Sequence, residues 1–251
     1  MRLCSDRLAP IAAKLPARDD QEPNPTREAI KQISATIQTT HDPEVIAMLA
    51  RCWTVMAGRM TEQETRAAFV ETLVANEELA NRAARPALCQ AAVALAMAAT
   101  PGRAKDPVGH LLILLHNDHD PDVLEILLDG IEALASTVLP DDAGFVAGRI
   151  IAVTGEQNRM NDQVVDSLMK SLDALPGDMD KLVLVELLKS PFCTDAARQT
   201  LLKMIESQTK LNFAGNPWKL VASAKEAGID PQVFRQPARL PKDVTVTETV
   251  K

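Results

Sequence analysis

The chain has 251 residues and a formal net charge of −7, from 27 Lys and Arg against 34 Asp and Glu. Binding to a phosphate backbone needs Lys and Arg gathered on one surface, so this balance argues against generic nucleic-acid binding and favours a protein or peptide partner. Hydrophobic residues make up 46% of the chain, with no Tyr, five Phe and ten Gly. This composition favours helix over sheet and predicts an all-α fold.

The cysteines Cys4, Cys52, Cys89 and Cys193 are far apart and form no C-x-x-C pair. They indicate neither a zinc site nor a disulfide framework, and Cys52 and Cys89 are expected to be buried as small hydrophobic residues. The N-terminal MRLCSDRLAP lacks the apolar core of a signal peptide, and the apolar run Ala87–Ala99 is too short to span a bilayer. We expect a cytoplasmic protein that does not insert into a membrane.

Residues 1–23 mix charges with prolines and are expected to form a loosely held arm. A helix then begins at Pro25. The next helix begins after Asp42, because an Asp can cap the free amides and the proline that follows it loses no hydrogen bond at the first helical position. This helix bears Trp53, which aligns with Ile131 of a later repeat and is therefore expected in the core.

Thr61 and Glu64 have the spacing of a capping box for the following helix. Its expected apolar face carries Phe69, Val70, Leu73 and Val74. An Ala-rich helix comes next, from about Asn81 to Ala99, in which Pro86 indicates a kink or a late beginning.

Six further helices are expected along the chain, each opened by a capping residue or a proline. They begin at Asp106, Asp120, Pro140, Asn161, Asp178 and Thr194. A last helix is expected near Trp218–Ala227, and residues 230–251 form a tail with no core to join.

The chain repeats itself. His41–Gly58, HDPEVIAMLARCWTVMAG, returns 78 residues later as His119–Ser136, HDPDVLEILLDGIEALAS. Leu95 lies 39 residues before Leu134, half of that offset, so the hairpin between them is a weaker middle copy. Further on, DQVVDSLMKSLDAL and DAARQTLLKMIESQ align at an offset of 33. A drifting period is typical of helical hairpins with variable loops and predicts about five two-helix units within residues 24–229.

These units resemble HEAT-type helical repeats, in which an Asp, a Pro and a Val lie near the start of the second helix. The resemblance is carried by Asp42-Pro43-x-Val45 and Asp120-Pro121-x-Val123. It implies a right-handed α-solenoid of about five antiparallel helical hairpins, HEAT- or armadillo-like, over Asn24–Ala227. Tetratricopeptide repeats are the alternative, but the Tyr of their signature is absent and the spacing here is longer and irregular.

In HEAT-type solenoids the second helix of each pair lines the concave side, so the resemblance implies candidate partner-binding residues there. Aligning the repeats places one residue of each second helix on the same rung, namely Arg51, Gln90, Asp129, Lys170 and Lys203. Asp122, Glu125 and Glu132 join Asp129 and make the centre of this surface acidic. A partner with a basic segment would complement it, whereas a merely solvated helix face is the alternative interpretation.

One cluster contains atoms that bind metals: His110, His116 and His119 with Asp118 and Asp120. The His-x-x-His spacing lies across a turn and Asp120 is expected to cap a helix, so no metal site is predicted. The sequence contains no nucleophile motif, no phosphate-binding glycine loop and no H-E-x-x-H pattern. We expect no catalytic residues and no cofactor.

The function these patterns favour is a non-enzymatic scaffold or adaptor that binds a protein or peptide on its concave helical surface. One alternative is a bacterial effector or secretion-system component that holds a host or apparatus protein. Another is a helical-repeat nucleic-acid glycosylase or lyase, which would need a basic concave surface with exposed aromatic residues. The sequence does not indicate an oligomeric state.

Overall fold

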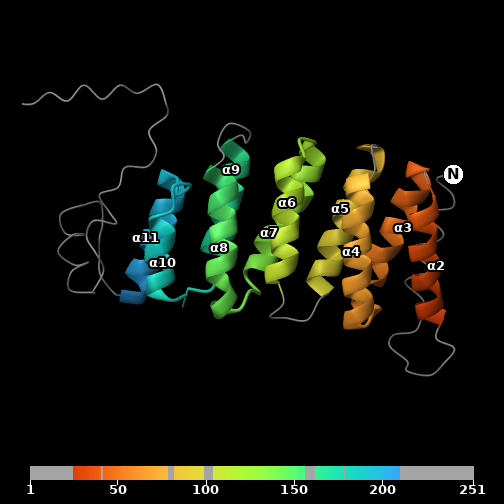
Figure 1. The fold of residues 1–251 in the computed structure, drawn as a ribbon, viewed down its shortest axis with the longest axis horizontal. Helices are drawn as coiled ribbons and strands as arrows, with labels where there is room; N and C mark the ends of the chain where they lie inside the picture. The colour runs from red at the N-terminus through yellow and green to blue at the C-terminus, as the bar shows by residue number, and fades with distance from the viewer. Residues whose placement is uncertain are drawn as a thin grey trace, which may run out of the picture. The chain divides into compact units, whose positions relative to one another are not determined.

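The computed structural model describes residues 25–209, except 41, 79–81, 99–103, 156–161 and 178. Apart from two 3-10 turns, η1 (Ala57–Arg59) and η2 (Arg82–Ala84), the elements of this part of the chain are α-helices (Figure 1). They are α2 (Pro25–Thr39), α3 (Pro43–Met56), α4 (Glu62–Glu78), α5 (Arg85–Ala98), α6 (Lys105–Asn117), α7 (Pro121–Ala135), α8 (Pro140–Gly155), α9 (Asp162–Asp173), α10 (Lys181–Leu188) and α11 (Asp195–Thr209). The chain divides into two compact units, Met1–Leu139 (unit 1) and Pro140–Lys251 (unit 2).

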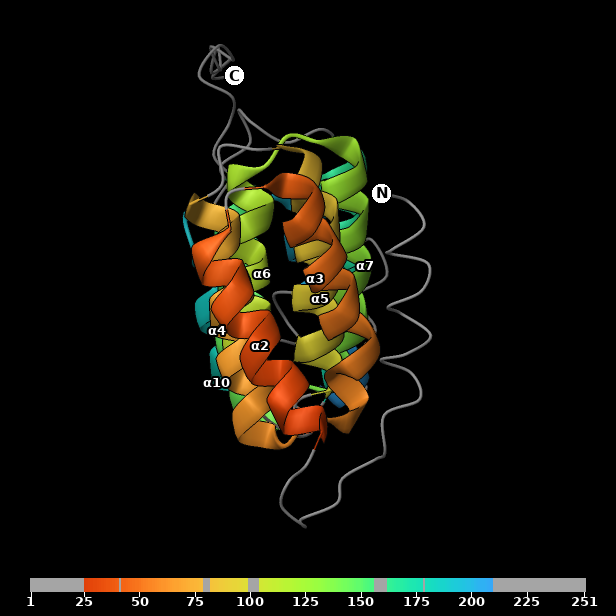
Figure 2. The ribbon, with the colours of Figure 1, turned by 90° about the vertical axis from the view of Figure 1, so that its right-hand side faces the viewer.

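Unit 1 contains three helical hairpins, α2/α3, α4/α5 and α6/α7. The second helices α3, α5 and α7 pack against one another in sequence, and α2 packs against α4. Seen end-on, α2, α4 and α6 form one layer and α3, α5 and α7 the other (Figure 2). One hairpin cannot bury its apolar faces alone, so the core of unit 1 forms where successive hairpins stack.

Unit 2 contains the hairpins α8/α9 and α10/α11, with α8 against α10 and α9 against α11. Glycines let α8 approach the neighbouring hairpin closely. A Cβ at Gly144 would collide with Val183 Cγ1, and a Cβ at Gly155 would lie 2.5 Å from Phe192 Cβ. Close packing of these two hairpins therefore depends on the absence of side chains at both positions.

Helix starts follow the capping signals in the sequence. Asp42 Oδ1 accepts a hydrogen bond at 2.9 Å from the amide two residues on, and Asp120 Oδ1 accepts the equivalent bond at 3.0 Å. In α4 the Glu64 amide donates to Thr61 Oγ1 at 3.3 Å, and Glu64 Oε2 accepts from the Thr61 amide at 2.8 Å. The two predicted Asp caps and the predicted capping box are confirmed.

Three other helix starts need comment. Helix α5 begins one residue before Pro86, after a 3-10 turn, so the proline marks a late beginning and not a kink. The prediction that Asp106 opens α6 is wrong, because the N-cap residue is Ala104, which makes no side-chain hydrogen bond. Asp106 lies in the first turn of α6, where the helix dipole favours its negative charge. Helix α10 begins at Lys181, later than the predicted start at Asp178.

The predicted apolar face of α4 is also partly wrong. Phe69 is buried, but Val70 and Val74 are 51% and 46% exposed. The buried side of α4 instead carries polar residues, namely Thr65, Thr72 and Asn76. Thr72 Oγ1 donates to the Ala68 carbonyl at 2.7 Å, so this buried hydroxyl is satisfied within its own helix.

Core positions inferred from the repeat alignment are confirmed. Trp53 and Ile131 are both 0% exposed, and Cys52 and Cys89 are buried. No helix of the described part is long and apolar enough to cross a membrane. The predicted arm at 1–23, the predicted helix near Trp218–Ala227 and the predicted tail at 230–251 lie outside the described residues.

Candidate functional site

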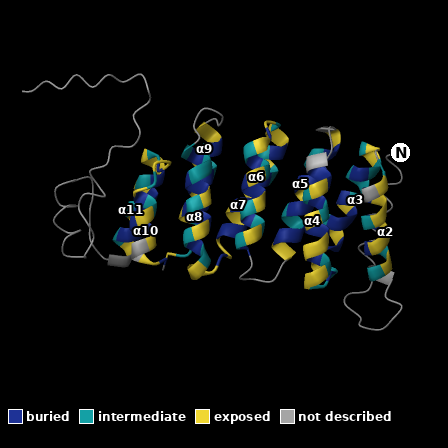
Figure 3. Cartoon of the chain, in the orientation of Figure 1, coloured by how far each residue is buried: buried dark blue, intermediate teal, exposed yellow. Residues whose placement is uncertain are grey.

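The predicted rung residues are exposed on the second helix of each hairpin. In unit 1, Arg51 of α3, Gln90 of α5 and Asp129 of α7 lie on helices that pack against one another in that order. In unit 2, Lys170 of α9 and Lys203 of α11 are exposed on a second pair of packed helices. Figure 3 shows that exposed and buried residues alternate along the helices, in yellow and dark blue. Whether these residues bind a partner remains a prediction.

Helix α7 presents an acidic stripe, by which we mean Asp122, Glu125, Asp129 and Glu132. All four are exposed, and their spacing of three, four and three residues places them on one side of the helix. The opposite side is buried through Val123, Leu127, Leu128, Ile131 and Leu134. None of the four carboxylates forms an ion pair with another described residue.

Beside the acidic stripe lies an uncharged band on α5, formed by Gln90, Ala94 and Met97. Gln90 is exposed, Ala94 is half-buried and Met97 is 47% exposed. The two helices approach closely at Gly130 of α7, where an added Cβ would lie 2.5 Å from Val93 Cγ2. Gly130 therefore lets the helix that carries the acidic stripe pack closely against the helix that carries the uncharged band.

We call the exposed side of α3, α5 and α7 the second-helix face of unit 1. It contains Arg51 and Val55 on α3, the uncharged band on α5 and the acidic stripe on α7. Charge and apolar surface thus occur side by side within one unit. Such a face can attract a basic segment and also cover apolar side chains of that segment.

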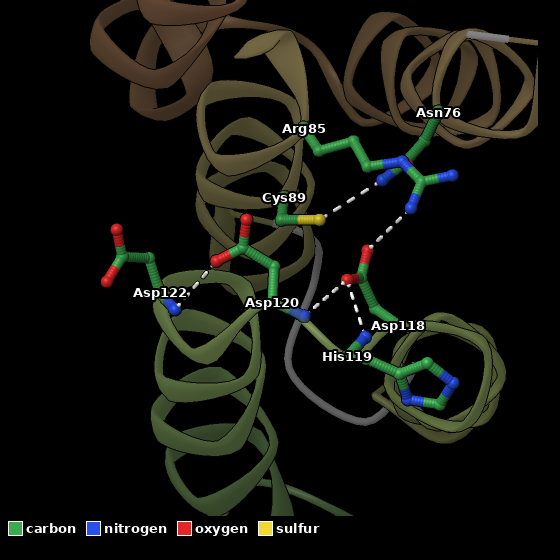
Figure 4. A network of polar contacts seen from close by, with 7 residues as sticks. All are labelled: Asn76, Arg85, Cys89, Asp118, His119, Asp120 and Asp122. Atoms are coloured by element: carbon green, nitrogen blue, oxygen red, sulfur yellow. Dashed lines mark hydrogen bonds and ion pairs between the residues drawn. The ribbon is translucent and has the colours of Figure 1, made fainter. Parts of the chain in front are cut away.

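A polar network holds the start of α7 against α5 (Figure 4). Arg85 Nη1 of α5 donates to Asp118 Oδ2 at 3.2 Å, and the Asp118 side chain is 9% exposed. Asp118 Oδ1 accepts from the amides of His119 and Asp120 at 2.8 Å and 2.9 Å. Asp120 in turn caps α7, so these contacts fix both the loop and the direction of the acidic stripe.

The same network accounts for the histidine-rich junction. Both Asp118 oxygens are engaged by Arg85 and by backbone amides. His110 Nδ1 lies 2.8 Å from the Asp106 carbonyl, and its ring meets the Phe69 ring edge-on, with centroids 6.0 Å apart. Among the described residues, no three His, Cys, Asp or Glu side chains are grouped so that they could hold a metal ion.

The buried thiols are poor nucleophiles. Desolvation by burial raises the pKa of Cys89 to about 11, and Asn76 Nδ2 lies 3.1 Å from its Sγ. Burial also raises the pKa of Cys52 and Cys193. Since the thiolate is the reactive form, these side chains are suited to packing and not to covalent catalysis.

Sequence reasoning missed a second set of exposed residues, which lie on first helices. In unit 1 they are Val70 and Val74 of α4 and Ile113 of α6. In unit 2 they include Val183 of α10 and Phe145 of α8, whose ring has the Arg149 guanidinium 5.3 Å from its centroid. Single exposed apolar residues are common on soluble proteins, and these lack the charged stripe that marks the second-helix face.

Comparison with known proteins gives a fold and no family. No protein-family profile matches the chain, and no curated protein matches it. One solved chain is similar over 82% of this chain and 83% of its own length, with a TM-score of 0.51 and 14% sequence identity. That structure concerns the structural basis of microtubule plus end tracking by XMAP215, CLIP-170 and EB1.

The class of the protein follows from the fold and this likeness. The chain has an all-α, HEAT-like helical-repeat fold, built from successive helical hairpins. Five hairpins lie within the described residues, which agrees with the number expected from the sequence repeats. At 14% identity the likeness shows the fold alone.

Proposed function

We propose that the chain is a non-enzymatic interaction scaffold that binds a protein or peptide partner on its second-helix face. HEAT-type helical repeats typically serve as protein-binding scaffolds. The observation that carries the proposal is the acidic stripe: four exposed carboxylates, unpaired with other described residues, beside the uncharged band of α5. All four residues are exposed, so core packing does not explain the stripe. Helix stability does not explain it either, because like charges at these spacings disfavour a helix.

The chemistry of the face supports a partner with a basic segment. Carboxylates at regular spacing on one helix complement Lys and Arg on an extended or helical segment. Met97, Val55 and the small Ala94 offer apolar contact beside that charge. The equivalent positions of unit 2, Lys170 and Lys203, are basic, so that unit would contact a different part of the partner.

The same proposal places the protein in the cytoplasm, without a catalytic role or a cofactor. The raised pKa values of Cys89 and of the other buried thiols support only the part that excludes a catalytic thiol. Asp118 and Asp120 are engaged in structural hydrogen bonds, which supports a structural role for these two carboxylates. The similar solved structure contributes the fold to the proposal and not the identity of the partner.

The test begins with an affinity pull-down, and mass spectrometry then identifies the partner. Binding of the purified partner is compared between the wild-type chain and the double variant Asp129→Lys/Glu132→Lys. We expect the double variant to bind about three- to tenfold more weakly at low salt, with a shallower salt dependence, because exposed pairs contribute modestly and are screened.

The control is Glu62→Lys/Asp106→Lys, which makes the same change in charge at exposed positions in the first turns of α4 and α6. Because Lys is unfavourable at a helix N-terminus, the thermal stability of the control is measured alongside its binding. The control should bind as the wild-type chain does. Unchanged affinity of Asp129→Lys/Glu132→Lys at low salt would remove the second-helix face from consideration. The loop around His116 would then be the next surface to examine.

A further inference from the structure

The second-helix face of unit 1 matches a stretch of this chain's own sequence. Residues 2–18 contain four basic residues, Arg2, Arg7, Lys14 and Arg18, and one acidic residue, Asp6, which gives a formal charge of +3. The same stretch carries Leu8, Ile11 and Leu15, spaced three and four residues apart. The residues that follow are acidic, so the positive charge is confined to this stretch, which we call the basic arm.

We propose that the basic arm occupies the second-helix face of unit 1 in the same molecule. Its Lys and Arg side chains pair with the acidic stripe of α7, and its leucines and isoleucine cover Met97 and Ala94 of α5. This inference rests on the surface used in the proposed function. It adds that the face has an internal occupant, which a partner must displace.

Charge complementarity is the first support. The acidic stripe forms no ion pair with a described residue, although its four carboxylates lie within three turns of helix. Arg51 is exposed on α3, two helices away in the same layer. A segment with basic and apolar side chains together therefore satisfies both halves of the face, whereas a purely basic segment would leave Met97 uncovered.

The tether is the second support. Lys14 lies 11 residues before Pro25, where α2 begins. An extended chain spans about 3.3–3.6 Å per residue, so 11 residues reach roughly 35–40 Å. Packed helices lie about 8–10 Å apart, so the three helix steps from α2 through α3 and α5 to α7 cover roughly 25–30 Å. Lys14 and the residues of the basic arm before it can therefore reach the acidic stripe.

Tethering also makes weak contacts sufficient. A short flexible connection gives an effective concentration in the millimolar range, so an arm with millimolar intrinsic affinity would occupy the face about half of the time. The apparent affinity for a partner is then the intrinsic affinity multiplied by the fraction of molecules whose face is free. The expected role of the basic arm is to raise the affinity that a partner needs.

The full chain carries a natural reporter for this contact, because Cys4 lies in the basic arm and Cys52, Cys89 and Cys193 are buried. A second thiol is introduced by Gln90→Cys in the centre of the face. The matched control is Val70→Cys, which is exposed on α4 in the other layer of unit 1. Each variant is treated with oxidised glutathione at low salt, and products are separated on non-reducing gels.

We expect an intramolecular disulfide between Cys4 and the thiol at position 90 to form at least about tenfold faster than the Val70→Cys product, as expected for a raised effective concentration. High salt, or Asp129→Lys/Glu132→Lys in the same background, should remove that advantage. Adding Cys4→Ser should abolish the product. Met97→Cys serves as a second variant on the face if Gln90→Cys lowers the thermal stability.

Equal rates for the Gln90→Cys and Val70→Cys variants would overturn the proposal. A concentration-dependent disulfide between two molecules would also overturn it, since the occupant would then be a second copy. This outcome is independent of the partner test. A fast intramolecular product would retain the basic arm contact. The proposed function would be refuted if Asp129→Lys/Glu132→Lys left partner binding unaltered also in a chain whose arm is weakened by Arg7→Gln/Lys14→Gln.

Discussion

Removal of the Asp118 carboxylate is expected to destabilise unit 1 more than any exposed charge would. Asp118→Ala deletes the ion pair with Arg85 and two hydrogen bonds to backbone amides at 2.8 Å and 2.9 Å. Breaking a buried ion pair costs about 3–5 kcal/mol, but the Arg85 side chain is 29% exposed and water can partly replace its partner. We therefore expect a loss of about 3 kcal/mol in the free energy of unfolding.

Asp118→Asn separates the two contributions. The amide oxygen still accepts from the backbone, while the charge opposite Arg85 is lost, so the expected cost is only about 1–2 kcal/mol. A double-mutant cycle with Arg85→Met, which keeps much of the apolar stem, should give a coupling energy of about 1–2 kcal/mol. Urea unfolding followed by Trp53 fluorescence in a Trp218→Phe background reports on unit 1.

Two results would refute this reasoning about Asp118. A loss below about 0.5 kcal/mol for Asp118→Ala would place the carboxylate among ordinary surface charges. Additive effects of Arg85→Met and Asp118→Ala would show that the 3.2 Å contact contributes no coupling in solution.

Three further predictions concern packing and ionisation. Trp53→Ala should lower the free energy of unfolding by about 3–5 kcal/mol, because it truncates a large, fully buried side chain. In a Trp218→Phe background the emission of Trp53 should be that of a buried indole. Red-shifted emission would contradict the assigned register. Burial raises the pKa of Cys89 from 9.0 to about 11, so with rising pH the thiol ionises in the unfolded chain before it ionises in the folded one. The free energy of unfolding, measured by urea unfolding, should therefore fall between pH 9 and 11. This fall should be steeper in the wild type than in Cys89→Ala. Gly130→Ala should lower the free energy of unfolding by about 1–3 kcal/mol, because the added methyl group overpacks against Val93. Adding Val93→Ala should restore part of this loss in thermal melts. Additive losses for the two substitutions would contradict the contact.

Much of the fold could be predicted because the repeat encodes local structure twice. Asp42 and Asp120 carry the same capping chemistry at the same place in their hairpins, and both caps form. Trp53 and Ile131 occupy equivalent core positions, and both are fully buried. A pattern that recurs at a fixed offset removes ambiguities that a single amphipathic helix would leave.

The face of α4 could not be predicted in the same way. Hydrophobicity alone assigned Val70 and Val74 to the core, but the buried side is made by Thr65, Thr72 and Asn76, which find hydrogen-bond partners locally or on Cys89. Small polar residues can be buried when their hydrogen bonds are satisfied. No periodicity rule shows this before the neighbouring helix is in place.

The Arg85–Asp118 ion pair could not be predicted from the sequence either. The two residues are 33 positions apart, and a lone Arg and a lone Asp at that distance form no motif. The sequence did place all eight candidate partner-binding residues at positions that are exposed. Exposure is a necessary condition for binding, and the binding role itself remains a prediction.

The acidic stripe offers a last test of whether it serves solubility or recognition. Successive carboxylates form like-charged pairs at Asp122/Glu125, Glu125/Asp129 and Asp129/Glu132, and each such pair disfavours a helix by about 0.2–0.5 kcal/mol. Glu132 also lies in the last turn of α7, where the helix dipole disfavours negative charge. The stripe should therefore lower the stability of the helix that carries it.

In a chain without residues 1–23, where the basic arm cannot pair with the stripe, neutralising the last two carboxylates by Asp129→Asn/Glu132→Gln should raise the melting temperature by a few degrees at low salt, since 1 kcal/mol corresponds to about 2–4 °C for a chain of this size. The gain should shrink at high salt, where repulsion is screened. The same change should weaken binding of a basic partner, because the carboxylates that destabilise the free helix are the ones that meet Lys and Arg in the complex. In the full chain the rise should be smaller, because the basic arm pairs with the same carboxylates. An equal rise with and without residues 1–23 would contradict the arm contact, and a lower melting temperature in the shortened chain would contradict the repulsion within the stripe.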